Sequence, residues 1–335
     1  MLSVITVYND ERCFREHLLA TLAMQSARHE LIALDNTGGQ FASAAAALNA
    51  GAAKASGDYF MFIHQDMRFL AGDTLAAIEE CMRSLPDAGI AGVIGMSATG
   101  GLTGRILNAY QYLGTPLAGP AQVQTLDGCL LIIPRAVFAR APFDENLTGW
   151  QFYGADYCLS TQKTGRKAYA LPVVTHHFCL GGDGRQFAAF RAIRKRHAAS
   201  FPIIHTTCGT ISRGKLARYW LKQAFHLLQP TPLTFFRGVM QDGEVKSLLI
   251  VEPGCEADYS FPAAGKLLTF SRRFARRGER FDCVILTDLD LTLDRDVLLG
   301  NIAEAERAGE KIFVSYRGRR PPPFLPPALL ARGFG

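Results

Sequence analysis

Three clusters of polar residues each follow a short apolar run in the N-terminal part of the chain: Tyr8-Asn9-Asp10, Asp35-Asn36 and His64-Gln65-Asp66. In an open α/β sheet, ligands bind at the edge formed by the carboxyl ends of the strands. A carboxylate at that edge can accept hydrogen bonds from a ribose or coordinate a divalent cation. We therefore expect the three clusters to meet in one crevice, with Asp66 placed to meet a substrate or a metal.

Further candidates lie later in the chain, and they are aromatic, acidic or imidazole side chains: Asp127, Trp150, Tyr153, Asp156, His176 and His177. Aromatic rings beside carboxylates suit sugars, whose C–H faces stack while their hydroxyls bond to the acids. Imidazole suits Mn²⁺ as a ligand. Because side chains alternate along a strand, the adjacent histidines point to opposite sides, and one of them is expected to join a metal site.

The elements that must position these residues alternate between strand and helix. Apolar runs predict strands, and amphipathic or alanine-rich segments predict helices, in this order: strands 2–7, 31–34, 59–63 and 91–95, with helices 41–55 and 74–84. Such alternation is typical of a parallel, doubly wound sheet with helices on both faces. The first turn, Val7-Tyr8-Asn9-Asp10-Glu11, has no glycine, which argues against a dehydrogenase, and Asn9 is the expected N-cap of the following helix.

The middle of the chain is less regular. Residues 97–125 are predicted to form a glycine-rich loop, after which strands are expected over 126–134 and 168–175. The second of these strands would deliver His176 and His177 at its end.

Taken in order, these motifs resemble the family 2 glycosyltransferases of the GT-A fold: Val-Ile-Thr-Val-Tyr-Asn-Asp, Leu-Asp-Asn, Gly-Asp-Tyr, His-Gln-Asp, Asp-Gly-Cys-Leu-Leu, Gly-Trp-Gln-Phe-Tyr-Gly-Ala-Asp and His-His. The resemblance is greatest to a bacterial subset with His-Gln-Asp in place of Asp-x-Asp, and it covers about residues 1–205. It implies an α/β fold with a doubly wound mixed sheet. It also implies an inverting enzyme that moves a sugar from a nucleotide-sugar donor to a glycan, lipid-linked or protein acceptor.

The resemblance assigns roles to particular residues. The nucleotide-sugar would be bound by residues at the strand ends and in the following helix: Val7, Tyr8, Asn9, Asp35, Asn36, Asn49, His64, Gln65 and Asp66. Mn²⁺ or Mg²⁺ would be held by Asp66 and by His176 or His177, of which His176 is favoured. His64 stands where relatives have an acid, so it is expected to bond to the diphosphate or ribose, or to be a satisfied histidine at a strand end.

The expected catalytic base is Asp156, with Asp144, Glu145 and Asp127 as alternatives and a helix N-cap as the structural role. Most relatives carry an acidic pair at the positions of Tyr153 and Gly154, so this chain departs from their pattern. Acceptor binding is assigned to Asp127, Trp150 and Tyr153. The loop 181–185 could fold over the diphosphate.

The composition sets limits on the function. The chain has 335 residues, a formal charge of +6 and eight cysteines without a paired spacing, which indicates reduced thiols in the cytoplasm. No apolar run is long enough to span a bilayer. Basic and aromatic residues alternate over 215–225, which would suit either a peripheral contact with an anionic membrane or packing between domains. A nucleic-acid partner is not expected.

We expect four parts: a GT-A domain over 1–205, a helical linker over 206–239, a small Rossmann-like α/β unit over 240–318 and a proline-rich tail over 319–335. Strands 247–251, 281–286 and 311–315 and helices 264–277 and 298–308 make up the small unit, whose order is similar to parts of S-adenosylmethionine-dependent methyltransferases. The glycine-poor loop Glu252-Pro253-Gly254-Cys255 favours a structural remnant, and Asp288-Leu289-Asp290 is interpreted as a loop. Methyl transfer and non-catalytic glycan binding are the alternative functions.

Overall fold

The computed structural model describes residues 1–178, 187–212, 232–252, 258–272, 274, 279–289 and 295–316. These residues fall into two compact units. The first contains the described residues up to 212 apart from 108–112, and the second contains 108–112 and the described residues from 232 onward.

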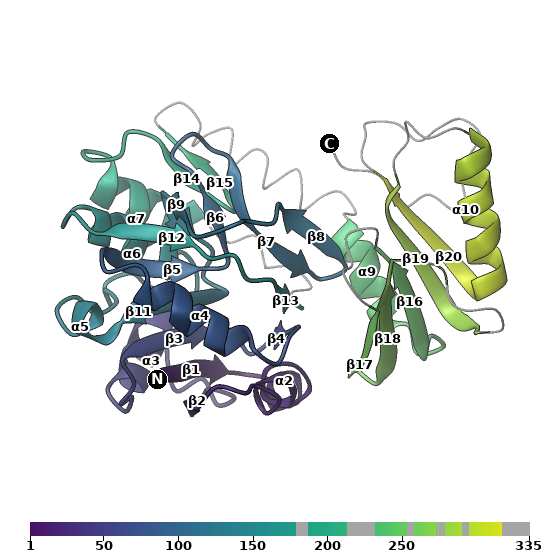
Figure 1. The fold of residues 1–335 in the computed structure, drawn as a ribbon, viewed down its shortest axis with the longest axis horizontal. Helices are drawn as coiled ribbons and strands as arrows, with labels where there is room; N and C mark the ends of the chain where they lie inside the picture. Colours follow the sequence, from purple (N-terminus) through teal and green to yellow (C-terminus); the bar gives the residue numbers. More distant parts are fainter. Residues whose placement is uncertain are drawn as a thin grey trace. The chain divides into compact units, whose positions relative to one another are not determined.

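A seven-stranded mixed sheet forms the centre of the first unit, in the order β2-β1-β3-β11-β5-β12-β9 (Figure 1). Its strands are β1 (Leu2–Tyr8), β2 (His29–Asp35), β3 (Tyr59–Ile63), β5 (Ala88–Gly92), β9 (Ala121–Val123), β11 (Leu130–Pro134) and β12 (Lys167–Ala170). β1 runs parallel to β2 and β3, whereas β11 is antiparallel to β3 and β5. The α/β fold and the mixed sheet therefore agree with expectation.

Strand β3 is buried on both faces because its neighbours and the helices cover it. Phe60 and Phe62 belong to one apolar core, and Met61 and Ile63 belong to the other. The alternation follows from the strand period of two, which sends successive side chains to opposite faces. An uncharged run of this kind is stable only inside a layered fold, so β3 lies between helices.

Helical segments supply both layers: α1 (Glu11–Phe14), the π-helical η1 (Arg15–Leu19), α2 (Ala20–Leu22), α3 (Ala44–Ala52), α4 (Thr74–Arg83), α5 (Arg135–Phe138), α6 (Tyr153–Gln162) and α7 (Phe187–His197). Asp10, rather than the expected Asn9, caps α1, because its carboxylate accepts a hydrogen bond from the Cys13 amide. Helix α3 lies close to the sheet: a β-carbon at Gly51 would come within 2.5 Å of Ile5 Cγ2.

The predicted loop over 97–125 is wrong in part, because much of it is strand. β6 (Ile94–Met96), β7 (Leu102–Asn108) and β10 (Thr125–Leu126) join β13 (Thr175–His177) and β4 (Met67–Phe69) in a second sheet, in the order β10-β6-β7-β13-β4, with β8 (Gln111–Gly114) beside β7. Gly104 and Gly114 have φ values of +96° and +78°, which only glycine adopts without strain. The glycines that suggested a loop therefore allow bends between short strands.

The expected strand over 168–175 is two strands in two sheets. β12 ends at Ala170, and β13 begins at Thr175 and pairs antiparallel with β4, so that His177 lies opposite Met67 and His176 opposite Arg68. A short hairpin, β14 (Ile204–Thr206) with β15 (Gly209–Ile211), completes the described strands of the first unit.

Buried His17 should make the first unit sensitive to acid. Its side chain is stacked on Phe178, and burial, reinforced by the positive charge of Arg68, lowers the pKa of His17 to about 4. The unfolded chain binds this proton near pH 6.5, so the free energy of unfolding should fall by about 3 kcal/mol as the pH drops from 6.5 to 4.

Urea unfolding at a series of pH values tests this expectation. His17→Gln should remove that part of the pH dependence, whereas His29→Gln, at a partly buried position in β2, should retain it. An unchanged slope in His17→Gln would contradict the assignment.

The second unit has a five-stranded sheet in the order β17-β18-β16-β19-β20. Its elements are α9 (Pro232–Gln241), β16 (Ser247–Val251), β17 (Tyr259–Ala263), β18 (Lys266–Ser271), β19 (Phe281–Leu289), α10 (Arg295–Ala308) and β20 (Gly309–Tyr316). The predicted helix over 264–277 is wrong in its first part, because Ala264 and Gly265 have positive φ values and turn the chain into the β17–β18 hairpin. Among the described helices of either unit, none has the length and apolar character needed to cross a membrane.

Candidate active site

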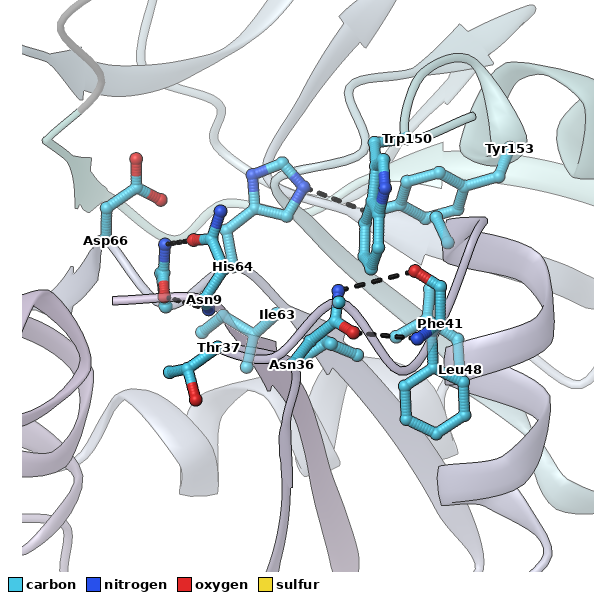
Figure 2. A pocket seen from close by; sticks show the side chains of 14 residues that line it. Asn9, Asn36, Thr37, Phe41, Leu48, Ile63, His64, Asp66, Trp150 and Tyr153 are labelled. Atoms are coloured by element: carbon cyan, nitrogen blue, oxygen red, sulfur yellow. Dashed lines mark hydrogen bonds between the residues drawn. The ribbon is translucent and has the colours of Figure 1, made fainter. Parts of the chain in front are cut away.

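A cavity of about 560 Å³ opens at the carboxyl edge of β1, β2 and β3 (Figure 2). The strand register brings the three ends level, since Tyr8 lies opposite Asp35 and Ile5 lies opposite Phe62. The cavity is lined by residues from these strand ends, from α3 and from the segment before α6: Val7, Asn9, Asn36, Thr37, Gly39, Phe41, Ala44, Leu48, Ile63, His64, Gln65, Asp66, Trp150 and Tyr153. Its volume is within the range of small-molecule sites.

Gln65 joins the ends of β1 and β3. Its side-chain oxygen accepts hydrogen bonds from the backbone amides of Asn9 (3.0 Å) and Asp10 (3.1 Å), and its Nε2 donates to Asn9 Oδ1 (2.6 Å). These three bonds fix the floor of the cavity beside Asp66.

The end of β2 forms the opposite rim. Asp35 Oδ1 accepts hydrogen bonds from the amide and hydroxyl of Thr37, and these bonds hold the pKa of Asp35 below its usual value. Asn36 is buried. Its Nδ2 donates a hydrogen bond to the Phe41 carbonyl, and its Oδ1 accepts one from the Phe41 amide. Asn36 therefore shapes the cavity, whereas Asp35 is outside its lining. Tyr8 is also outside it, and its ring stacks on Phe14.

Asn49 does not reach the cavity. Its Nδ2 donates to the Phe143 carbonyl and to Glu145 Oε1, both at 2.9 Å, and its Oδ1 accepts from the Phe143 amide at 3.1 Å. The expected nucleotide contact is replaced by a structural one, in which α3 holds the segment that precedes α6.

Three side chains at the edge of the cavity could hold a metal ion. One potential ligand atom from each of His64, Asp66 and His177 lies within 4.8 Å of the others, the only such group found among the described residues. Asp66 Oδ1 is 3.4 Å from His177 Nε2, and the rings of His64 and His177 are 5.5 Å apart. One carboxylate and two imidazoles are donors that suit a divalent transition metal, so the residues present fit such an ion.

The charges of this group are strongly coupled. Burial alone would raise the pKa of Asp66, but the adjacent His177 and His64 outweigh burial and hold that pKa well below its usual range. Burial opposes a charge on His177, yet Asp66, followed by Asp127, raises the pKa of His177 above its ordinary value. Without a metal, Asp66 and His177 therefore each favour the charged form of the other.

The geometry favours His177 over His176, contrary to our expectation. His176 is fully buried, and its ring meets Phe178 edge to face at 5.8 Å. Residues 171–174, between β12 and β13, are not part of a strand. The alternation of side chains along β12 therefore does not predict which side His176 and His177 face. Pairing with β4 then places His177 beside Asp66.

Asp127 lies next to the metal-binding group, where its charge acts on both His177 and His64. Its carboxylate accepts hydrogen bonds from the Cys129 amide (3.0 Å) and from the Thr207 hydroxyl (2.6 Å), at the tip of the β14–β15 hairpin. Burial raises the pKa of Asp127, but His177 and the bond from Thr207 outweigh it and lower the pKa overall. Asp127 is therefore an ionised carboxylate beside the site. Thr207 was not among the predicted residues.

Asp156 is not placed to act as a base at the cavity. It lies in the first turn of α6, it is buried, and its Oδ1 is 2.7 Å from His197 Nε2 and 3.3 Å from Arg196 Nε. Arg196 also pairs with Asp144 at 2.5 Å. These contacts attach α7 to α6, so the structure gives Asp156 and Asp144 a role in packing.

The aromatic candidates divide between the cavity and the core. Trp150 is 43% exposed and lines the cavity. Tyr153 also lines it, but its hydroxyl is turned inward and donates to the Gly128 carbonyl at 2.6 Å. Trp150 is therefore exposed at the cavity, whereas Tyr153 is held within the protein.

Several lining residues were missed: Thr37, Gly39, Phe41, Ala44, Leu48 and Ile63. Ala44 and Leu48 are one turn apart at the start of α3, and this spacing is the signal that could have found them. The predicted loop Asp288-Leu289-Asp290 is wrong in part, because β19 extends to Leu289. Asp290 lies outside the described residues, as do the predicted loop 181–185, the basic and aromatic segment 215–225, the tail 319–335, and Pro253, Gly254 and Cys255 of the methyltransferase-like loop.

Comparison with known proteins gives one family and several distant likenesses. Residues 3–200 match the model of a glycosyltransferase-like family. A protein from Fuscovulum blasticum described as ATP synthase subunits region ORF 6 is 27% identical over 173 residues, covering 48% of this chain and 69% of that protein.

Two solved structures are similar at low identity. Mannosyltransferase PcManGT from Pyrobaculum calidifontis, in complex with GDP-Man and Mn²⁺, has a TM-score of 0.41 and 15% identity and covers 71% of this chain and 72% of its own. TarS 1-349 from S. aureus has a TM-score of 0.42 and 14% identity and covers 58% of this chain and 64% of its own. At these TM-scores and identities, the two structures assign no role to any residue of this chain.

Proposed function

Because the chain belongs to the glycosyltransferase-like family, we propose that it is an inverting, metal-dependent enzyme that transfers a sugar from a nucleotide-sugar donor to an acceptor hydroxyl. The family match confirms the enzyme class predicted from the sequence motifs. The mechanism and the acceptor, a glycan, a lipid-linked glycan or a protein, are part of the proposal. The observation that carries it is the metal-binding group His64, Asp66 and His177 at the edge of a cavity large enough for a nucleotide.

The donor would occupy the cavity with its base and ribose between the ends of β1 and β2. Asn9 and Thr37 offer polar groups to these parts, and Phe41 and Leu48 provide apolar surface. The diphosphate would then extend toward Asp66. Asp35 lies on the exposed rim, where its carboxylate, oriented by the amide and hydroxyl of Thr37, would accept a hydrogen bond from a ribose hydroxyl.

Asp66 and His177, with His64 beside them, would hold Mn²⁺ or Mg²⁺. When bound, such an ion neutralises charge on the departing nucleoside diphosphate. Asp66 supplies the negative charge of the ligand set, and the hydrogen bonds of Gln65 keep the adjacent backbone in place.

Asp127 is our proposed base, in place of Asp156. The acceptor hydroxyl gives its proton to the Asp127 carboxylate while its oxygen forms the new bond to the anomeric carbon. The bond between that carbon and the diphosphate oxygen breaks on the opposite face, which inverts the configuration. Thr207 and the Cys129 amide would orient the carboxylate, and Trp150 would stack on a sugar ring.

Thermal shift and turnover with a panel of nucleotide-sugars test the proposal. A matching donor at a hundred times its Kd should stabilise the protein by about 2.7 kcal/mol in the presence of Mn²⁺, raising Tm by several degrees. Slow release of the nucleoside diphosphate should follow, and EDTA should stop it. If a broad panel gave neither a metal-dependent shift nor release, the proposed function would be wrong.

A further inference from the structure

We infer that Tyr153 is a positioning residue: its hydroxyl oxygen accepts a hydrogen bond from Nε2–H of His64, which leaves Nδ1 of His64 as a third ligand, with Asp66 and His177, of a divalent metal ion. The inference rests on the proposed function, because it concerns the metal of that same site. It differs from the expected roles of both residues, which were diphosphate or ribose binding for His64 and acceptor binding for Tyr153.

The direction of the hydrogen bonds follows from what each group can do. The Gly128 carbonyl can only accept, and the Tyr153 hydroxyl lies 2.6 Å from it, so the single phenolic proton is donated there. His64 Nε2 is 3.0 Å from the same phenolic oxygen. With its proton committed, that oxygen can only accept from His64. Nε2 must therefore carry the proton, and Nδ1 of the neutral ring keeps its lone pair.

The phenol is held in this place by its surroundings. Its ring lies against the bare α-carbon of Gly128, where an added β-carbon would be 3.2–3.3 Å from ring and hydroxyl atoms. The ring also packs edge to face on Phe143, with centroids 5.5 Å apart. Burial raises the pKa of Tyr153 well above its ordinary value, so the hydroxyl remains a donor.

The other ring nitrogen faces the metal-binding group. Figure 2 shows His64 with Nε2 turned toward Tyr153 and Nδ1 turned toward the side on which Asp66 lies. The His64 amide donates to the Cys129 carbonyl at 2.9 Å, which fixes the backbone from which the ring projects. A ring nitrogen that coordinates a metal usually has its partner nitrogen tied in this way, because the second hydrogen bond selects the tautomer.

This arrangement explains how the chain manages without the first acid of Asp-x-Asp. Either oxygen of a carboxylate at position 64 could coordinate the metal. A neutral histidine can coordinate it only through its unprotonated nitrogen, so the correct tautomer must be selected. The hydrogen bond between Tyr153, at the start of α6, and Gly128, just before β11, selects the tautomer of His64. The resulting set of two imidazoles and one carboxylate should prefer Mn²⁺ to Mg²⁺.

Tyr153→Phe tests the inference, because it removes only the hydroxyl. Mn²⁺ binding to the full chain, measured by the loss of the free-ion EPR signal, should weaken about 10- to 100-fold. In the metal-free protein, ¹H–¹⁵N spectra of the histidine rings should show His64 as the Nε2–H tautomer in the wild type and a changed tautomer balance in the variant.

Tyr157→Phe is the matched control. Tyr157 lies one turn further along α6, and its buried hydroxyl has no hydrogen-bond partner among the described residues, so this variant should match the wild type. A double-mutant cycle adds a second control: once His64→Ala has removed the ring, Tyr153→Phe should cause little further loss of Mn²⁺ affinity.

The outcomes separate the inference from the proposed function. If Tyr153→Phe kept both the wild-type Mn²⁺ affinity and the wild-type His64 spectrum, or if the two changes were independent in the cycle, the inference would be wrong. Nucleotide-sugar turnover by the wild type would then still stand. Conversely, the expected Mn²⁺ pattern without turnover of any donor would uphold the inference and remove the proposed function.

Discussion

Replacing Asp66 by asparagine is expected to lower kcat/KM for nucleotide-sugar turnover on the order of a thousandfold. Asparagine keeps the size of the side chain but removes the only carboxylate in the metal-binding group His64, Asp66 and His177. The amide is a much weaker ligand for a divalent cation, and it cannot form an ion pair with His177, now 3.4 Å away. Steady-state kinetics with saturating Mn²⁺, together with Mn²⁺ titration, give the two readouts.

Asp87→Asn is a suitable control for this variant. Asp87 forms an ion pair with Lys167 at 2.8 Å. It lies just before β5 begins, at the amino end of that strand, whereas the cavity lies at the carboxyl ends of β1, β2 and β3. The Asp87→Asn variant also loses one carboxylate and one ion pair, but Asp87 does not line the cavity. Its turnover should therefore stay within about twofold of the wild type. Asp66→Asn with wild-type turnover and Mn²⁺ affinity would exclude Asp66 as a metal ligand.

Asp127→Asn is expected to lower kcat by about 10²- to 10⁴-fold while donor and Mn²⁺ affinity change little. The amide oxygen can still accept from the Cys129 amide, and the amide nitrogen can donate to the Thr207 hydroxyl, but the side chain cannot take the proton of the acceptor hydroxyl. Single-turnover transfer to an acceptor, with donor binding measured separately by calorimetry, distinguishes a slow chemical step from weak binding.

Asp156→Asn is the informative counterpart, because the sequence favoured that residue as the base. It should reduce the free energy of unfolding by about 2 kcal/mol, since the negative charge that faces buried His197 and Arg196 is removed, while kcat of the folded protein is retained. The reverse result, with turnover lost in Asp156→Asn and kept in Asp127→Asn, would return the catalytic base to α6.

The sequence predicted the central strands well and the metal ligands only in part. Strand β3 was predicted with its observed bounds, because a short uncharged apolar run between two polar turns is typical of a buried strand. Strand alternation predicted that one of His176 and His177 is a ligand but could not decide which, because the chain leaves the first sheet at Ala170 and enters the second at Thr175. Local periodicity holds no information about such a change of sheet.

Partners that are distant in the sequence account for the other errors. The family pattern draws attention to Asp156 but says nothing of His197, which approaches it from α7, 41 positions further on. Asn49 was expected to contact the nucleotide, although its partners are Phe143 and Glu145. In the second unit, the apolar spacing of residues 264–277 suits a helix, but the positive φ values of Ala264 and Gly265 begin a hairpin strand instead.

The pairing of β13 with β4 also bears on when the site can exist. His64 and Asp66 emerge early during synthesis, at the end of β3, but His177 reaches them only after the intervening chain has folded and β13 has found its register opposite Met67. Closing so long a loop is among the slower steps of folding. A ribosome-bound nascent chain that stopped before Thr175 would therefore present two ligands without the third, so metal capture would mark the pairing of β13 with β4.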